Sequence, residues 1–200
     1  MIIDWITGNS VEIFGAAAGI IYVFLEIRQS LWLWPVGIAT AAAYIWIFFT
    51  ARLYADMSLQ VYYVLISILG WYWWVTGKRN GKTGNAEKKR MPVSRINLKL
   101  AILLFFILAG IYTIIYFVLY RFTNSPVPGW DAFITSVSII ATWMLARKIY
   151  EHWWLWIAVN SVSVILCFMR GLYPTAVLYT IYGTMSVVGL VEWKKSINGY

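Results

Sequence analysis

Seven stretches of predominantly apolar residues follow one another along this 200-residue chain. A helix needs about 20 apolar residues to cross the hydrocarbon core of a bilayer. A helix also satisfies its own backbone hydrogen bonds, which a segment surrounded by lipid must do. The sequence therefore predicts an all-α integral membrane protein with seven transmembrane helices. Their approximate limits are residues 9–27, 31–51, 54–76, 98–120, 130–147, 153–169 and 172–192.

The composition agrees with a membrane location and excludes several kinds of chemistry. Hydrophobic residues make up 62% of the chain and charged residues 12%, whereas about a quarter of the residues in soluble domains are charged. One Cys and one His are too few for a zinc site, and a Ser-His-Asp triad cannot be built on a single His that lies in a loop, so neither an enzyme nor a bound cofactor is predicted. We expect Cys167 to pack inside a span and His152, in a charged segment, to be a solvated loop residue.

The distribution of Lys and Arg predicts the orientation in the membrane. Of the 16 basic residues, all except Arg52, Arg121 and Arg170 fall on one side of the seven spans. Short loops rich in Lys and Arg remain in the cytoplasm, so the N-terminus is predicted outside, and the C-terminus and the loop 77–97 inside. This topology signal accounts for the net charge of +8, and no nucleic-acid partner is predicted.

An internal repeat is the most informative feature of the organisation. With an offset of 119, the matching residues of the first copy are Leu53, Tyr54, Leu59, Tyr63, Ser67, Gly70 and Trp74. Upstream, "WLW" at 32–34 matches "WLW" at 154–156, which suggests an offset of 122 there. The first three spans therefore resemble the last three. An intervening fourth span gives both copies one orientation, as in transporters built from parallel repeats.

The repeat predicts three segments. Residues 1–76 form the first three-helix repeat, and residues 77–129 hold the basic cytoplasmic loop and a linker helix. Residues 130–200 form the second repeat and a short cytoplasmic tail.

Polar side chains are spaced along one face of several spans. The residues concerned are Gln60, Tyr63 and Ser67 in the third span, Trp156 and Asn160 in the sixth, and Tyr179, Tyr182 and Ser186 in the seventh. Polar groups within a bilayer are costly and face the bundle interior, a partner or a cavity. Hydrogen bonds that hold helices together are one explanation. The primary amides also offer both donors and acceptors to a ligand, so we expect Gln60 and Asn160 to bind one.

Aromatic residues point to the kind of ligand. Most of the 13 Trp residues lie at span ends, where indoles anchor helices at the membrane interface. Trp46 and Trp143 lie within predicted spans and need another explanation. Stacking on a nucleobase-like ring contributes about 1–3 kcal/mol, and a cationic ring adds a cation–π attraction. A heteroaromatic ligand with a sugar-like group fits this combination.

Acidic residues are placed toward the ends of the predicted spans rather than at their centres. They are Glu12, Glu26, Asp56, Asp131 and Glu192. Carriers driven by protons use buried carboxylates. The placement therefore favours uncoupled, facilitated movement down a gradient.

These motifs together resemble the PnuC family of vitamin transporters, which carry nicotinamide riboside. The resemblance covers the whole chain and rests on Asp56-x3-Gln60, Ser67, Gly70, Trp71, Trp74 and Trp156-x3-Asn160 within a seven-span 3+1+3 frame. The family's polar site positions fall on Gln60 and Asn160, with Asp56, Ser67 and the tryptophans around them. The second copy departs from an ideal repeat because Tyr179 stands at the position of Gln60, so an asymmetric site is expected.

The resemblance implies a fold similar to that of the SWEET sugar transporters and a homotrimer in a bacterial inner membrane. It also implies uptake of nicotinamide riboside by facilitated diffusion, with a cytoplasmic kinase phosphorylating the product and so trapping it. Two other interpretations remain open: a carrier of the same architecture for thiamine, another vitamin or a sugar, and a membrane subunit that does not transport and docks a partner through loop 77–97.

Overall fold

The computed structural model describes residues 10–50, 52, 54–77, 91–123 and 125–198. The side chains of residues 10–14 and 54–56 lie outside the description. The chain divides into two compact units, residues 1–90 and 91–200, and each is described by itself. The predicted three-segment division remains a prediction.

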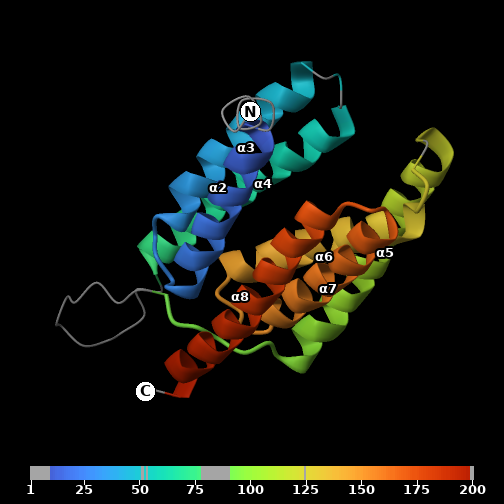
Figure 1. Ribbon diagram of the computed structural model, residues 1–200. Coiled ribbons are helices and arrows are strands. Elements are labelled where there is room, and N and C mark those ends of the chain that lie inside the picture. The colour runs from blue at the N-terminus through green and yellow to red at the C-terminus, as the bar shows by residue number, and fades with distance from the viewer. Residues whose placement is uncertain (1–9, 51, 53, 78–90, 124, 199–200) are drawn as a thin grey trace, which may run out of the picture. The chain divides into compact units, whose positions relative to one another are not determined.

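The described chain is all-helical, as predicted (Figure 1). The first unit holds α2 (Ser10–Ile27), α3 (Leu33–Thr50) and α4 (Tyr54–Thr76). The second unit holds α5 (Leu98–Phe122), α6 (Pro128–Ala146), α7 (His152–Met169) and α8 (Tyr173–Asn198). The predicted limits agree with these helices to within a few residues, except that α8 continues six residues beyond position 192.

Membrane-crossing length is found for most of these helices. Among the described residues, α3, α5, α6, α7 and α8 are each long and apolar enough to cross a bilayer. In α2 the residues whose side chains are described, Gly15–Ile27, form a shorter apolar segment. Helix α4 has 23 residues, but its many Tyr and Trp rings, which have polar edges, lower its mean hydropathy.

Tight packing of an indole on a glycine joins α3 to α4 in the first unit. The six-membered ring of Trp34 lies against Gly70, where a Cβ atom would come within 2.7 Å of the ring atom Cζ3. Trp74 packs edge-on against Trp34, with ring centroids 5.2 Å apart and an interplanar angle of 87°. Both indoles are almost fully buried. The absent side chain of Gly70 therefore allows the two helices to approach closely.

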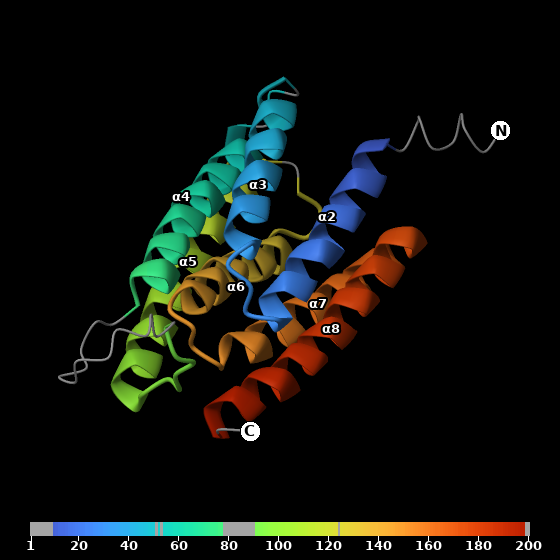
Figure 2. The ribbon, with the colours of Figure 1, turned by 90° about the vertical axis from the view of Figure 1, so that its left-hand side faces the viewer.

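The second unit repeats this arrangement between α7 and α8, which run side by side in Figure 2. The Trp153 ring lies against Gly189, and Trp193 packs edge-on against Trp153 at 5.8 Å and 83°. His152 contacts both indoles, with ring centroids 4.7 Å from each. It is fully buried, and its Nδ1 lies 2.7 Å from the carbonyl oxygen of Ile149. The prediction of a solvated His152 is wrong because α7 begins at this residue and turns its ring into the indole pair.

The backbone keeps one repeat offset of 119 throughout. Gln29 and Lys148, 119 residues apart, both take left-handed conformations, with φ values of 50° and 51°. Arg52 and Gly171 do the same at the next turn, with φ values of 59° and 72°. Trp34 likewise corresponds to Trp153 rather than to Trp156. The predicted change to an offset of 122 is therefore wrong.

Hydrogen bonds connect the segment before α5 to the turn between α6 and α7. The amide of Ser94 donates to the carbonyl of Lys148, and its own carbonyl accepts from the amide of Tyr150, both at 2.9 Å. The Ile96 amide donates to Oε2 of Glu151 at 2.9 Å. Asn97 then caps α5 by accepting from the amide of Leu100.

A hydrophobic core next to these hydrogen bonds packs α5 against α6. The buried side chains of this core are Leu104, Ile140, Met144 and Ile149.

Replacement of Gly171 by alanine should lower stability through backbone strain alone. A Cβ atom at this position would meet nothing within 4 Å, so packing is unaffected, but a left-handed backbone costs other residues about 1–2 kcal/mol. We expect Gly171→Ala to lower the thermal unfolding temperature in detergent by a few degrees. Arg52→Gly, at the equivalent turn, should raise it. A decrease in both variants would contradict this explanation.

Candidate functional site

Helix α4 carries the predicted polar face of the first unit. Ser67 is buried, and Gln60 and Tyr63 are half-buried. Gly37 of α3 lies beside this face, since a Cβ atom there would be 3.3 Å from Oγ of Ser67 and 3.0 Å from Cε2 of Tyr22. The structure thus places an α2 tyrosine and an α4 serine against the same point of α3.

Helices α7 and α8 form a hydrogen-bonded polar group in the second unit. Asn160 is 5% exposed, and its Nδ2 donates to Oγ of Ser186 at 3.2 Å. The Ser186 hydroxyl in turn donates to the carbonyl of Tyr182 at 2.8 Å. Gly183 of α8 lies beside Asn160, since a Cβ atom there would be in ordinary van der Waals contact with Cβ of Asn160, at 3.6 Å. The amide is therefore held in place by its neighbour across the helix pair.

Aromatic side chains accompany this group. Tyr179 and Tyr182 are half-buried, and their rings stand nearly perpendicular at 81° with centroids 6.1 Å apart. Trp156 lies one turn before Asn160 on the same face of α7. Its Nε1 is buried and has no hydrogen-bond partner among the described residues. The second unit thus presents an amide, an indole N–H and phenol rings together.

Three predicted site residues lie elsewhere or outside the description. Trp46 is 70% exposed. Trp143 is half-buried and packs on the core between α5 and α6, beside Ile140. The side chain of Asp56 lies outside the described residues. A contact of Trp46 or Trp143 with a ligand therefore stays a prediction.

Ser163 is a polar residue of α7 that the sequence reasoning missed. It is 3% exposed, and its Oγ has no hydrogen-bond partner among the described residues. Its spacing from Trp156 and Asn160, at i+7 and i+3, was the available signal.

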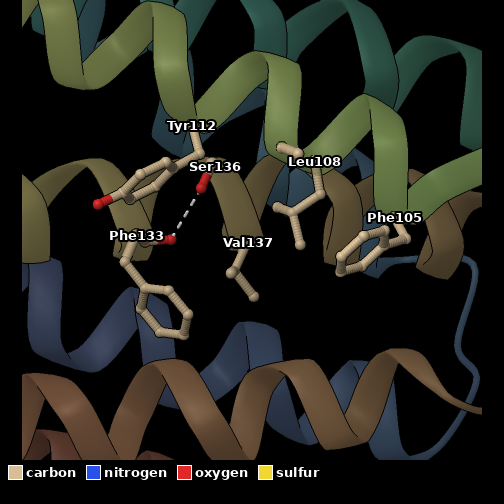
Figure 3. Close-up of a pocket in the computed structure, with 7 residues that line it drawn as sticks. Phe105, Leu108, Tyr112, Phe133, Ser136 and Val137 are labelled. Carbon is tan, nitrogen blue, oxygen red and sulfur yellow. Dashed lines mark hydrogen bonds between the residues drawn. The ribbon is translucent and has the colours of Figure 1, made fainter.

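An apolar pocket lies between α5 and α6, away from these groups (Figure 3). Its volume is about 260 Å³. The Ser136 hydroxyl in its wall donates its proton to the carbonyl of Phe133 at 3.1 Å. The pocket is lined by Phe105, Leu108, Ala109, Tyr112, Phe133, Ser136 and Val137. No predicted site residue lines it, and most of its lining side chains are apolar.

Comparison with known proteins gives consistent matches over nearly the whole chain. Residues 9–195 match the family described as nicotinamide mononucleotide transporter. The chain is 25% identical to the nicotinamide riboside transporter PnuC of Escherichia coli over 93% of its length and 85% of that protein. It is 26% identical to the riboflavin/roseoflavin transporter RibM of Streptomyces davaonensis, over 91% of this chain and 83% of that protein.

The fold has a counterpart among solved structures. The crystal structure of the vitamin B3 transporter PnuC matches with a TM-score of 0.70 and 23% sequence identity, over 92% of this chain and 80% of that chain. Both the sequence relatives and this structure are transporters, which agrees with the prediction that the chain is not an enzyme.

Proposed function

We propose that this chain, which belongs to the nicotinamide mononucleotide transporter family that includes the PnuC proteins, carries nicotinamide riboside across a membrane. The observation that carries this substrate assignment is the grouping of Asn160, Trp156 and the Tyr179–Tyr182 pair in one helix pair. A positively charged pyridinium ring is attracted to the faces of such rings. The carboxamide and the ribose require hydrogen-bonding groups such as the Asn160 amide.

The proposed site is asymmetric between the two repeats. In the register of 119, Asn160 corresponds to Ala41, and Gln60 corresponds to Tyr179. The two proposed amides, Gln60 of α4 and Asn160 of α7, therefore stand at positions that are not equivalent in the repeat. Ser67, Tyr63, Trp46, Trp143 and Asp56 remain proposed contacts of the site.

The proposed architecture is a 3+1+3 arrangement similar to that of SWEET transporters. The constant register of 119 between α2–α4 and α6–α8 supports two copies of one unit, with α5 as the linker helix. From the family resemblance we also propose a homotrimer in a bacterial inner membrane. The N-terminus is proposed outside and the C-terminus inside because the basic residues concentrate on one side of the spans.

We propose facilitated diffusion, with phosphorylation by a cytoplasmic kinase trapping the product. One carboxylate bears on this mechanism: Glu26 lies in the last turn of α2, as predicted, and is only 2% exposed. It lies within electrostatic range of the Tyr22 hydroxyl one turn earlier. Proton coupling through Glu26 is therefore the alternative that a transport assay must separate.

A flavin is the second candidate substrate, because the similar protein RibM is described as a riboflavin/roseoflavin transporter. A flavin also combines a flat heteroaromatic ring with a polyhydroxyl chain. Rings and amides of the same type suit both ligands.

Uptake into proteoliposomes tests the proposed function. We expect vesicles containing the purified protein to equilibrate with radiolabelled nicotinamide riboside much faster than empty vesicles, without exceeding the external concentration. An excess of unlabelled nicotinamide riboside should compete, whereas riboflavin, thiamine and glucose should not. A pH gradient should leave the plateau unchanged. Accumulation above the external concentration that is lost in Glu26→Gln would instead establish proton coupling, and uptake equal to empty vesicles would refute transport.

A further inference from the structure

The unpartnered hydroxyl of Ser163 differs from the hydroxyls around it. A serine inside a transmembrane helix ordinarily donates to the carbonyl one turn earlier. Ser161 donates in this way to Ile157, and Ser186 to Tyr182, both at 2.8 Å. Ser163 makes no such bond, although its side chain is 97% buried. Burial of a hydroxyl without a partner costs free energy, so this orientation needs a reason.

The position of Ser163 supplies that reason. Trp156, Asn160 and Ser163 follow one another at i, i+4 and i+7 and therefore lie on one face of α7. The indole N–H of Trp156 and the hydroxyl of Ser163, at the two ends of this row, are both buried without a partner among the described residues. At 1.5 Å per residue the row extends about 10 Å along the helix, which matches the length of a nucleoside.

The first repeat lacks this row. The residues 119 positions earlier are Gly37, Ala41 and Tyr44, of which two have no polar side-chain atom. Tyr44 packs on Phe48 at a centroid distance of 5.7 Å and directs its hydroxyl toward Gly15. The polar row is therefore not part of the packing that the two copies share.

We propose that Ser163 is a substrate-binding residue and that the bound nucleoside lies along α7 from Trp156 to Ser163. This inference rests on the proposed function. In it the Trp156 N–H and the Ser163 hydroxyl bind polar atoms at opposite ends of the nucleoside, with the Asn160 amide between them. The two buried groups then gain hydrogen-bond partners when substrate binds.

The test compares Ser163→Ala with Ser161→Ala in the full-length protein. Ser161 lies two residues away on the exposed side of α7 and satisfies its own hydroxyl. Titration calorimetry with nicotinamide riboside should show affinity about tenfold weaker in Ser163→Ala, equivalent to about 1.4 kcal/mol. Ser161→Ala should bind within twofold of the unaltered protein. Without ligand, Ser163→Ala should unfold at the same or a higher temperature, because a buried hydroxyl without a partner has been removed.

The outcomes separate this inference from the proposed function. If the unaltered protein binds nicotinamide riboside and the two variants bind equally well, the inference about Ser163 is overturned and the proposed function stands. A lower unfolding temperature in Ser163→Ala with unchanged affinity would make the hydroxyl structural and would also overturn it. If the unaltered protein binds only riboflavin, equal riboflavin affinity in the two variants overturns the inference about Ser163. Binding of neither compound would overturn the proposed function and this inference together.

Discussion

Gly189→Ala is expected to destabilise the protein more than alanine at any other described glycine of the second unit. The new Cβ atom would lie 2.7 Å from Cε2 of Trp153 and closer still to other atoms of that ring. Trp153 cannot withdraw, because it is 1% exposed and packs edge-on against Trp193. Overpacking of this kind costs about 1–3 kcal/mol. A thermal melt followed by Trp fluorescence in detergent should show a decrease of several degrees.

Gly110 is the matched control for this experiment. It also lies within a transmembrane helix, α5, but a Cβ atom there would meet nothing within 4 Å. Alanine is a better helix former than glycine by about 1 kcal/mol, so Gly110→Ala should raise the unfolding temperature. Gly70→Ala, at the equivalent contact with Trp34, should behave like Gly189→Ala. If Gly189→Ala and Gly110→Ala shifted the melt alike, the close approach of α7 and α8 would not depend on the glycine.

Replacement of Asn160 by alanine is expected to cause the largest loss of substrate binding. The amide is buried and oriented by its hydrogen bond to Ser186, so a polar atom of the ligand that it binds would be left unpaired within the protein. That penalty is about 1–3 kcal/mol, which corresponds to a loss of affinity of about 5- to 150-fold. Titration calorimetry with nicotinamide riboside measures it. Gln60→Ala should also weaken binding if the first half contributes its amide.

A stability measurement on Asn160→Ala separates ligand binding from helix packing. A hydrogen bond between transmembrane helices contributes about 0.6 kcal/mol on average, and Ser186 keeps its own bond to the carbonyl of Tyr182 in the variant. We therefore expect the unfolding temperature to fall by only one or two degrees. Unchanged affinity together with a clear decrease in stability would show that Asn160 serves only to hold α7 to α8.

The helices of this protein could be predicted from the sequence because hydropathy over about 20 residues is a strong signal. The predicted stretch 98–120 and the helix Leu98–Phe122 begin at the same residue. The repeat offset near Trp34 could not be predicted correctly, because "WLW" at 32–34 matches "WLW" at 154–156 in all three letters. At an offset of 119 only Trp34 of these three residues has an identical counterpart, which is Trp153. Packing decides the register: Trp153, not Trp156, lies on its glycine.

The candidate site was predictable in outline and not in detail. Helical spacing grouped Trp156 with Asn160, and the structure confirms that they lie on one helix. Ser163 shares that spacing, but a sequence cannot show that its hydroxyl lacks the usual bond to its own helix. His152 was predicted to be solvated because its neighbours in the chain are charged. It is buried instead, because α7 begins at this residue and its ring packs against two indoles.

The constant offset of 119 residues between the two copies indicates that the chain arose by an internal duplication. A duplication that leaves no insertion or deletion between the copies gives every residue of one copy a counterpart in the other. Where the copies still agree, as at Gly70 and Gly189, selection has kept what both need in order to assemble. Where they differ, as at Ala41 and Asn160, the packing that both copies share does not require the side chain. The differences between the copies are therefore the positions at which one half can serve a purpose that the other does not.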